Sequence, residues 1–119
     1  MGKVVVLGAS PDYERFSYKA VKSLKKRNYD VVAIGTQKGE IAGVVIDTGQ
    51  PIIDDVDTVA MYLNVKNQKE CYDYILSLKP RRIIFNPGTH NDELAEIARK
   101  NGIEVVNSCA LIMLSNDRF

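Results

Sequence analysis

The chain has 119 residues, which falls in the range of one domain and is long enough to bury most of a single core. Hydrophobic residues make up 45% and charged residues 26%, a composition that excludes a disordered or fibrous protein. Sixteen Lys and Arg against 15 Asp and Glu give a net charge of +1, so no overall field exists to hold a nucleic-acid polyanion. A small anionic ligand is compatible with this charge.

The sequence shows no sign of a membrane segment or a metal site. Its apolar runs are far shorter than the roughly 20 residues that cross a bilayer, and the first residues lead directly into a strand without a signal pattern. We therefore expect a cytoplasmic protein with no membrane partner. Cys71 and Cys109 lack metal-ligand spacing and are expected to be free thiols, and the single His90 cannot build a metal site by itself.

The first half of the chain alternates between strand and helix patterns. Residues 4–7 are uninterrupted and apolar, as in a strand that is buried on both faces. Residues 17–27 have one apolar face and a basic last turn, which predicts a surface helix. Residues 31–34 predict the second strand. Residues 36–42 are too few for a crossover helix, so we expect residues 44–46 to form at best a short edge strand of undetermined direction.

A second helix is expected after the next buried strand, residues 58–63. Asn67 stands three residues before Glu70, which is the spacing of a capping box, and an apolar stripe follows it. Pro80 ends this helix because proline cannot continue the hydrogen-bond ladder.

The last part of the chain repeats the alternation. Residues 83–85 predict a strand, Asn91 can cap a helix, and Gly102 is in the usual stop position. Residues 105–106 then close the sheet, and residues 108–114 predict a short terminal helical turn. This alternation predicts one α/β domain over residues 1–119, with a doubly wound, mainly parallel sheet. Ligands bind such sheets at the carboxyl ends of the strands, where the strand order reverses.

The loop after the first strand is suited to a phosphate but lacks two common fingerprints. Gly8 is followed by Ala9, Ser10 and Pro11, so the second and third glycines of a dinucleotide-binding loop are missing. Thr36 stands at the end of the second strand, where such proteins have an acidic residue for the ribose. No Gly-Lys-Ser/Thr follows to make a P-loop. A related NAD(P)- or nucleotide-binding module remains the alternative interpretation.

Four motifs, in order along nearly the whole chain, carry a resemblance to one family. They are Gly8-Ala9-Ser10 with Arg15, Ser17 and Tyr18; Lys38-Gly39 with Ile41 and Gly43; Asn86-Pro87-Gly88 with Asn91 and Glu93; and Val106-Asn107-Ser108-Cys109. They resemble the small CoA-binding proteins, which are related to the CoA-binding domain of the succinyl-CoA synthetase alpha subunit. The resemblance implies a three-layer Rossmann-like fold and binding of CoA or an acyl-CoA. It implies no ligase chemistry, because the domain that supplies the phosphorylated histidine is missing.

The chain departs from the family pattern in two places. Family members often have Asn-Pro before the lysine, where this chain has Thr36 and Gln37. They often carry two basic residues after the fourth strand, where this chain has Asn64, Val65 and Lys66.

The residues of the first loop suit the phosphates of CoA. A pyrophosphate needs backbone N–H groups together with separate positive charges. Gly8, Ala9 and Ser10 can offer N–H groups and a hydroxyl, and Ser17 lies at the helix start. Arg15 can add a bidentate, charge-assisted contact.

Further along the chain, Lys38 suits a ribose 3′-phosphate, because it stands where an NAD-binding protein has its acidic ribose ligand. The remaining residues that we assign to the site are Thr36, Asn86, Pro87, Gly88 and Cys109. A small enzyme that uses Cys109 as nucleophile is a third possibility. We expect this thiol to be structural and the protein to bind without catalysis, because no His or cationic residue adjoins Cys109 to lower its pKa.

Overall fold

Strands and helices alternate along residues 2–119, the part of the chain that the computed structural model describes. The strands are β1 (Lys3–Leu7), β2 (Val31–Ile34), β3 (Glu40–Ile41), β4 (Val44–Asp47), β5 (Val56–Met61), β6 (Arg82–Phe85) and β7 (Glu104–Asn107). The helices are α1 (Phe16–Lys26), α2 (Val65–Gln68), the 3₁₀ turn η1 (Lys69–Cys71), α3 (Tyr72–Ser77), α4 (Asp92–Lys100) and α5 (Ala110–Ser115). None of these helices is long and apolar enough to cross a bilayer.

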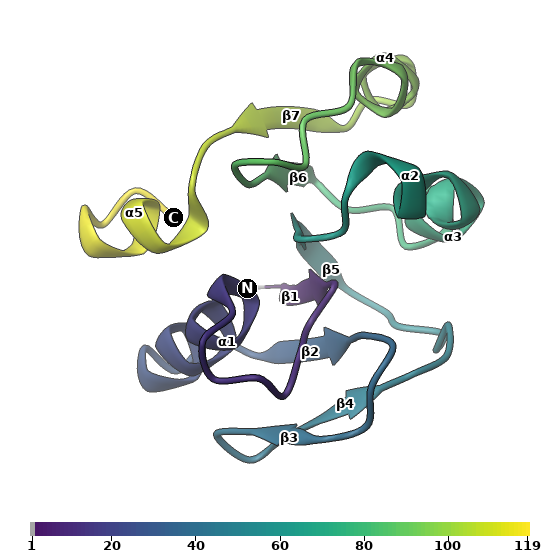
Figure 1. The fold of residues 1–119 in the computed structure, drawn as a ribbon. Coiled ribbons are helices and arrows are strands. Elements are labelled where there is room, and N and C mark those ends of the chain that lie inside the picture. Colours follow the sequence, from purple (N-terminus) through teal and green to yellow (C-terminus); the bar gives the residue numbers. More distant parts are fainter. Residues whose placement is uncertain (1) are drawn as a thin grey trace.

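The seven strands form one sheet in the order β3-β4-β2-β1-β5-β6-β7. All neighbours are parallel except β3 and β4. Helices α1 and α5 cover one face, and α2, α3 and α4 cover the other (Figure 1). This arrangement confirms the predicted three-layer, doubly wound, Rossmann-like α/β fold. Strand β1 has β2 on one side and β5 on the other, so the strand order reverses at its carboxyl end.

The short hairpin of β3 and β4 shows how the chain adds a parallel strand without a crossover helix. After β2 the chain runs back as β3, turns through Ala42 and Gly43, and returns as β4 between β3 and β2. Both turn residues have positive φ, 50° and 85°. The prediction that residues 44–46 form the edge was therefore wrong, since β3 is the edge strand and β4 pairs with a strand on each side.

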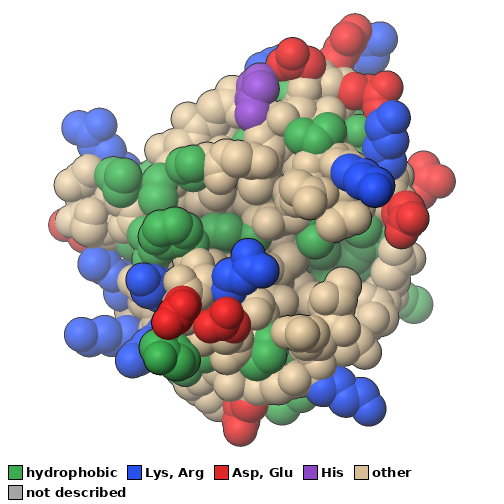
Figure 2. Space-filling view, viewed as in Figure 1, with side chains coloured by type: hydrophobic (Ala, Val, Ile, Leu, Met, Phe, Trp, Pro, Cys, Tyr) green, Lys and Arg blue, Asp and Glu red, His purple; other side chains and the backbone are tan. Residues whose placement is uncertain are grey.

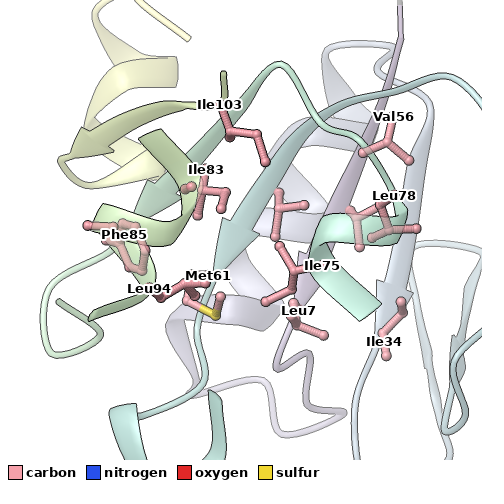
Figure 3. Close-up of a cluster of buried hydrophobic side chains, with 14 residues drawn as sticks. Leu7, Ile34, Val56, Met61, Ile75, Leu78, Ile83, Phe85, Leu94 and Ile103 are labelled. Carbon is pink, nitrogen blue, oxygen red and sulfur yellow. The ribbon is translucent and has the colours of Figure 1, made fainter. Parts of the chain in front are cut away.

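The hydrophobic core lies on both faces of β1. Val5 and Leu7 pack in the cluster under α3 and α4, which Figure 3 shows with Ile75 and Leu94. Val4 and Val6 pack in the cluster on the other face. Because alternate side chains of a strand point to opposite faces, an all-apolar run of this kind joins two core layers.

The bounds of β5 and the start of α2 differ from their predictions. Strand β5 covers 56–61 instead of 58–63. It begins to pair with β1 at Val56, and after its end Tyr62 and Leu63 lie against Gly8. Helix α2 begins three residues earlier than expected, since Asn64 is its cap and accepts a hydrogen bond from the backbone N–H of Asn67 at 2.9 Å. The predicted cap of α4 is confirmed, because the Asn91 side chain accepts from the N–H of Leu94 at 3.1 Å.

Candidate functional site

A cavity of about 640 Å³ opens at the carboxyl ends of β1, β2 and β5, where the strand order reverses. Its lining residues come from four loops and the first turns of α1 and α2. They are Gly8, Ala9, Ser10, Glu14, Arg15, Phe16, Ser17, Thr36, Gln37, Tyr62, Leu63, Asn64, Asn67, Pro87 and Thr89. Most are small or polar, and Arg15 and Glu14 are the charged residues among them. This composition suits a ligand with anionic and neutral parts.

The cavity brings together most of the residues that the sequence assigns to the site. Those that line it are Gly8, Ala9, Ser10, Arg15, Ser17, Thr36 and Pro87. Four others lie outside the lining: Lys38, Asn86, Gly88 and Cys109. Of these, Lys38 is exposed in the loop between β2 and β3, and Cys109 is half-buried before α5.

The backbone N–H groups of Gly8 and Ala9 are already used inside the protein. Both donate to the carbonyl oxygen of Ile34, each at 2.8 Å, so the expectation that they are free for a phosphate was wrong. Gly8 is required here for a different reason. Its φ is +101°, and a Cβ at this position would lie 2.8 Å from the backbone nitrogen of Leu63. The absence of a side chain at Gly8 therefore makes room for the backbone that follows β5.

The N-terminus of α1 offers free donors to the cavity instead. No side chain caps this helix at Arg15, and its first turn holds no acidic residue. The first N–H groups of a helix have no partner within it and carry the positive end of the helix dipole. Ser10 adds a hydroxyl whose oxygen accepts from the N–H of Asp12 at 3.1 Å, which leaves its proton free to donate. Together with Arg15 these groups make a corner whose chemistry suits an anion.

Asn86 does not line the cavity, but its side chain links the elements behind it by hydrogen bonds. The residue is 3% exposed; its side-chain nitrogen donates to the carbonyl oxygen of Met61 at 2.9 Å, and its side-chain oxygen accepts from the N–H of Ala110 at 2.8 Å. Thr89 donates to the Asn86 carbonyl oxygen through its hydroxyl at 2.7 Å. Asn86 thus fixes the ends of β5 and β6 against the start of α5.

Gln68 supports the wall of the cavity and was not among the predicted site residues. This side chain is fully buried at the end of α2, and its amide nitrogen donates to the carbonyl oxygens of Leu63 at 2.9 Å and Thr89 at 2.8 Å. Its oxygen accepts from Asn91 at 2.9 Å. Because Leu63 and Thr89 both line the large cavity, Gln68 sets the distance between two of its walls. A glutamine in a polar stretch gives no sequence signal for such burial.

A second, mostly apolar cavity of about 190 Å³ adjoins the first. The two share Gly8, Thr36 and Leu63. The smaller one continues between the ends of β2 and β4 and the helices on that face, where Ile34 and Tyr74 are among its lining. The site therefore has a polar chamber and an apolar side pocket that meet beside Gly8.

Two side chains near the end of β7 have unusual surroundings. The Tyr62 hydroxyl is shielded from water and has no hydrogen-bond partner within residues 2–119, and burial, followed by the nearby Cys109, raises the pKa of Tyr62. His90 is exposed and lies between Asn107, at 2.9 Å, and Asp92, at 2.8 Å. These two hydrogen bonds raise the pKa of His90 and tie the end of β7 to the start of α4.

Comparison with known proteins gives one family and several similar structures. A family model described as "CoA binding domain" matches residues 2–115. A crystal structure of a protein described as uncharacterized is 49% identical, with a TM-score of 0.97, over 100% of this chain and 98% of that one. A protein of Thermus thermophilus (21% identity, TM-score 0.87, 99% of this chain and 91% of that one) and a hypothetical protein of Pyrococcus horikoshii (24%, 0.87, 97% and 82%) share the fold. No curated protein sequence matches the chain.

Proposed function

Because this chain belongs to the family of CoA binding domains, we propose that it binds CoA or an acyl-CoA in the cavity at the carboxyl ends of its strands, without catalysing a reaction. The observation that carries the proposal is the N-terminus of α1. No side chain caps this helix end, and Arg15, the residue just before the helix, lines the cavity. We further propose that residues 1–119 act as one domain in the cytoplasm.

The pyrophosphate of CoA fits the corner at the start of α1. The helix dipole and the free N–H groups of its first turn favour negative charge, and Arg15 supplies a planar donor that can bind two phosphate oxygens. Ser10 and Ser17 are among the residues that line the cavity at this corner. Gly8 and Ala9 then form the floor beneath the phosphates rather than their donors, since Ile34 accepts both of their N–H groups.

The apolar side pocket fits the adenine ring. It opens from the polar chamber beside Gly8 and Thr36, so a ligand with its phosphates at α1 can insert a flat base there. Lys38 is exposed to solvent two residues after Thr36 in the same loop, and we propose it as the partner of the ribose 3′-phosphate. Asn86 supports the wall formed by Pro87 and Thr89, since its backbone carbonyl accepts from the Thr89 hydroxyl, and Gly88 lies between these two residues in the chain.

The geometry at the end of β2 does not favour a nicotinamide dinucleotide. Gly35 and Thr36 stand where a carboxylate would bind the ribose hydroxyls, and a Cβ at Gly35 would collide with the carbonyl oxygen of Ala9. The ribose-binding group of an NAD protein is therefore missing at this strand end.

Thermal unfolding in the presence of CoA and NAD tests the proposal. CoA at about 100 times its dissociation constant should stabilise the fold by roughly 2.7 kcal/mol, which is visible in a melting curve. NAD at the same concentration should give little or no shift. A larger shift with NAD than with CoA would overturn the proposed ligand.

A further inference from the structure

Phe16 is a large apolar side chain in an unusual position. It is the first residue of α1 and lines the polar cavity, yet 68% of its surface is exposed. Lys19, one turn later, holds its ammonium 5.4 Å from the centre of the ring. Figure 2 shows hydrophobic side chains gathered on the side where α1 and α5 lie. An exposed ring in a ligand cavity contributes little to the core, which suggests that the ligand covers it.

The position of Phe16 relative to the two cavities indicates which part of a ligand would meet it. The apolar side pocket opens beside Gly8, Thr36 and Leu63, and Phe16 is not among its lining residues. The phosphate corner, at the start of α1, adjoins Phe16 directly in the chain. For a ligand with its base in the side pocket and its phosphates at α1, we infer that the other half, which extends from the phosphates away from the base, meets the Phe16 ring in the large cavity.

We propose that the Phe16 ring binds the pantoyl segment of CoA, an inference that rests on the proposed function. In CoA the carbon chain that follows the pyrophosphate begins with a methylene group, and its second carbon bears two methyl groups. Methyl groups pack well against an aromatic face, and burying two of them corresponds to roughly tenfold in affinity. Phe16 then discriminates CoA from nucleotides that share its phosphates but lack this apolar arm.

The test compares two ligands on one variant. Phe16→Ala is titrated by calorimetry with CoA and with 3′-phosphoadenosine 5′-diphosphate, which is CoA without the pantetheine arm. We expect CoA to bind roughly tenfold more weakly than to the wild type and the shorter nucleotide to bind equally well. Phe16→Leu, which keeps an apolar side chain, should retain part of the CoA affinity.

Val45→Ala is the matched control, because Val45 is 71% exposed on β4 and lies outside both cavities. It should change neither affinity. An equal loss for both ligands in Phe16→Ala would show that the ring stacks on adenine or supports the phosphates, and unchanged CoA affinity would show that it makes no contact; either result overturns the inference. If the wild type binds the shorter nucleotide but not CoA, or binds neither, the proposed function itself fails.

Discussion

Replacing Gln68 with methionine removes the connection between two walls of the cavity while keeping the length of the side chain. The variant loses the hydrogen bonds to the carbonyl oxygens of Leu63 and Thr89 and the one from Asn91. Asn91 keeps the hydroxyl of Tyr72 at 2.9 Å as a partner, so the buried carbonyl group of Thr89 and the part-buried one of Leu63 bear most of the loss. At about 1–3 kcal/mol for a buried group left without a partner, and about 1 kcal/mol for the part-buried carbonyl of Leu63, the free energy of unfolding should fall by roughly 2–4 kcal/mol. The melting temperature should fall by about 10 °C.

The assay measures stability by denaturant unfolding and CoA affinity by calorimetry on the same samples. Thr58→Val is the control, since Thr58 is also fully buried but holds Arg82, at 2.8 Å, near the amino ends of the strands. Both variants should lose stability. Only Gln68→Met should also bind CoA several-fold more weakly, because the loops it joins line the cavity. A loss below about 0.5 kcal/mol for Gln68→Met would refute the hydrogen-bond argument, since surface substitutions have effects of that size.

Three further predictions concern single residues. Arg15→Ala should weaken CoA and dephospho-CoA alike, whereas Lys38→Ala should weaken only CoA; unchanged discrimination between the two ligands in calorimetry would remove Lys38 from the site. The pKa of His90, measured by NMR titration, should lie above 6.5, so its stabilising contribution is complete below that pH and disappears as pH rises through the folded pKa; a value at or below 6.5 argues against its two hydrogen bonds. Gly35→Ala should lower the free energy of unfolding by about 1–3 kcal/mol in denaturant melts, because its Cβ meets the Ala9 carbonyl; Gly49→Ala, with ordinary space, is the control, and equal stability of the two variants would contradict this.

Much of the fold could be predicted because local signals and tertiary structure agree. The apolar run of β1 and the side chain of Asn91 mark a buried strand and a helix start directly in the sequence. The start of α2 could not be decided in this way, since Asn64 and Asn67 are both good caps, and only the path of the chain over Gly8 determines which one is used. The edge position of β3 was missed because a two-residue strand has no periodicity to detect.

The candidate site was predictable in its location but not in its hydrogen bonds. The carboxyl ends of parallel strands meet at one edge, so the loops that carry Ser10, Thr36 and Pro87 could be placed together from topology alone. Whether a backbone N–H is free depends on strand register, and this is why the use of the Gly8 N–H by Ile34 was not foreseen. The burial of Gln68 likewise depends on contacts with a loop 21 residues away.

A titration of the isotope-labelled protein with CoA, followed through its backbone amide signals, tests the central claim most directly. We expect saturable shifts that are largest for the N–H groups of Phe16 and Ser17 at the start of α1, and smaller for that of Gly8, which stays bonded to Ile34. Signals from the amino ends of the strands, such as Thr58, should not move. Absence of saturable shifts, or shifts that centre on those amino ends, would contradict a CoA site at the carboxyl edge of the sheet.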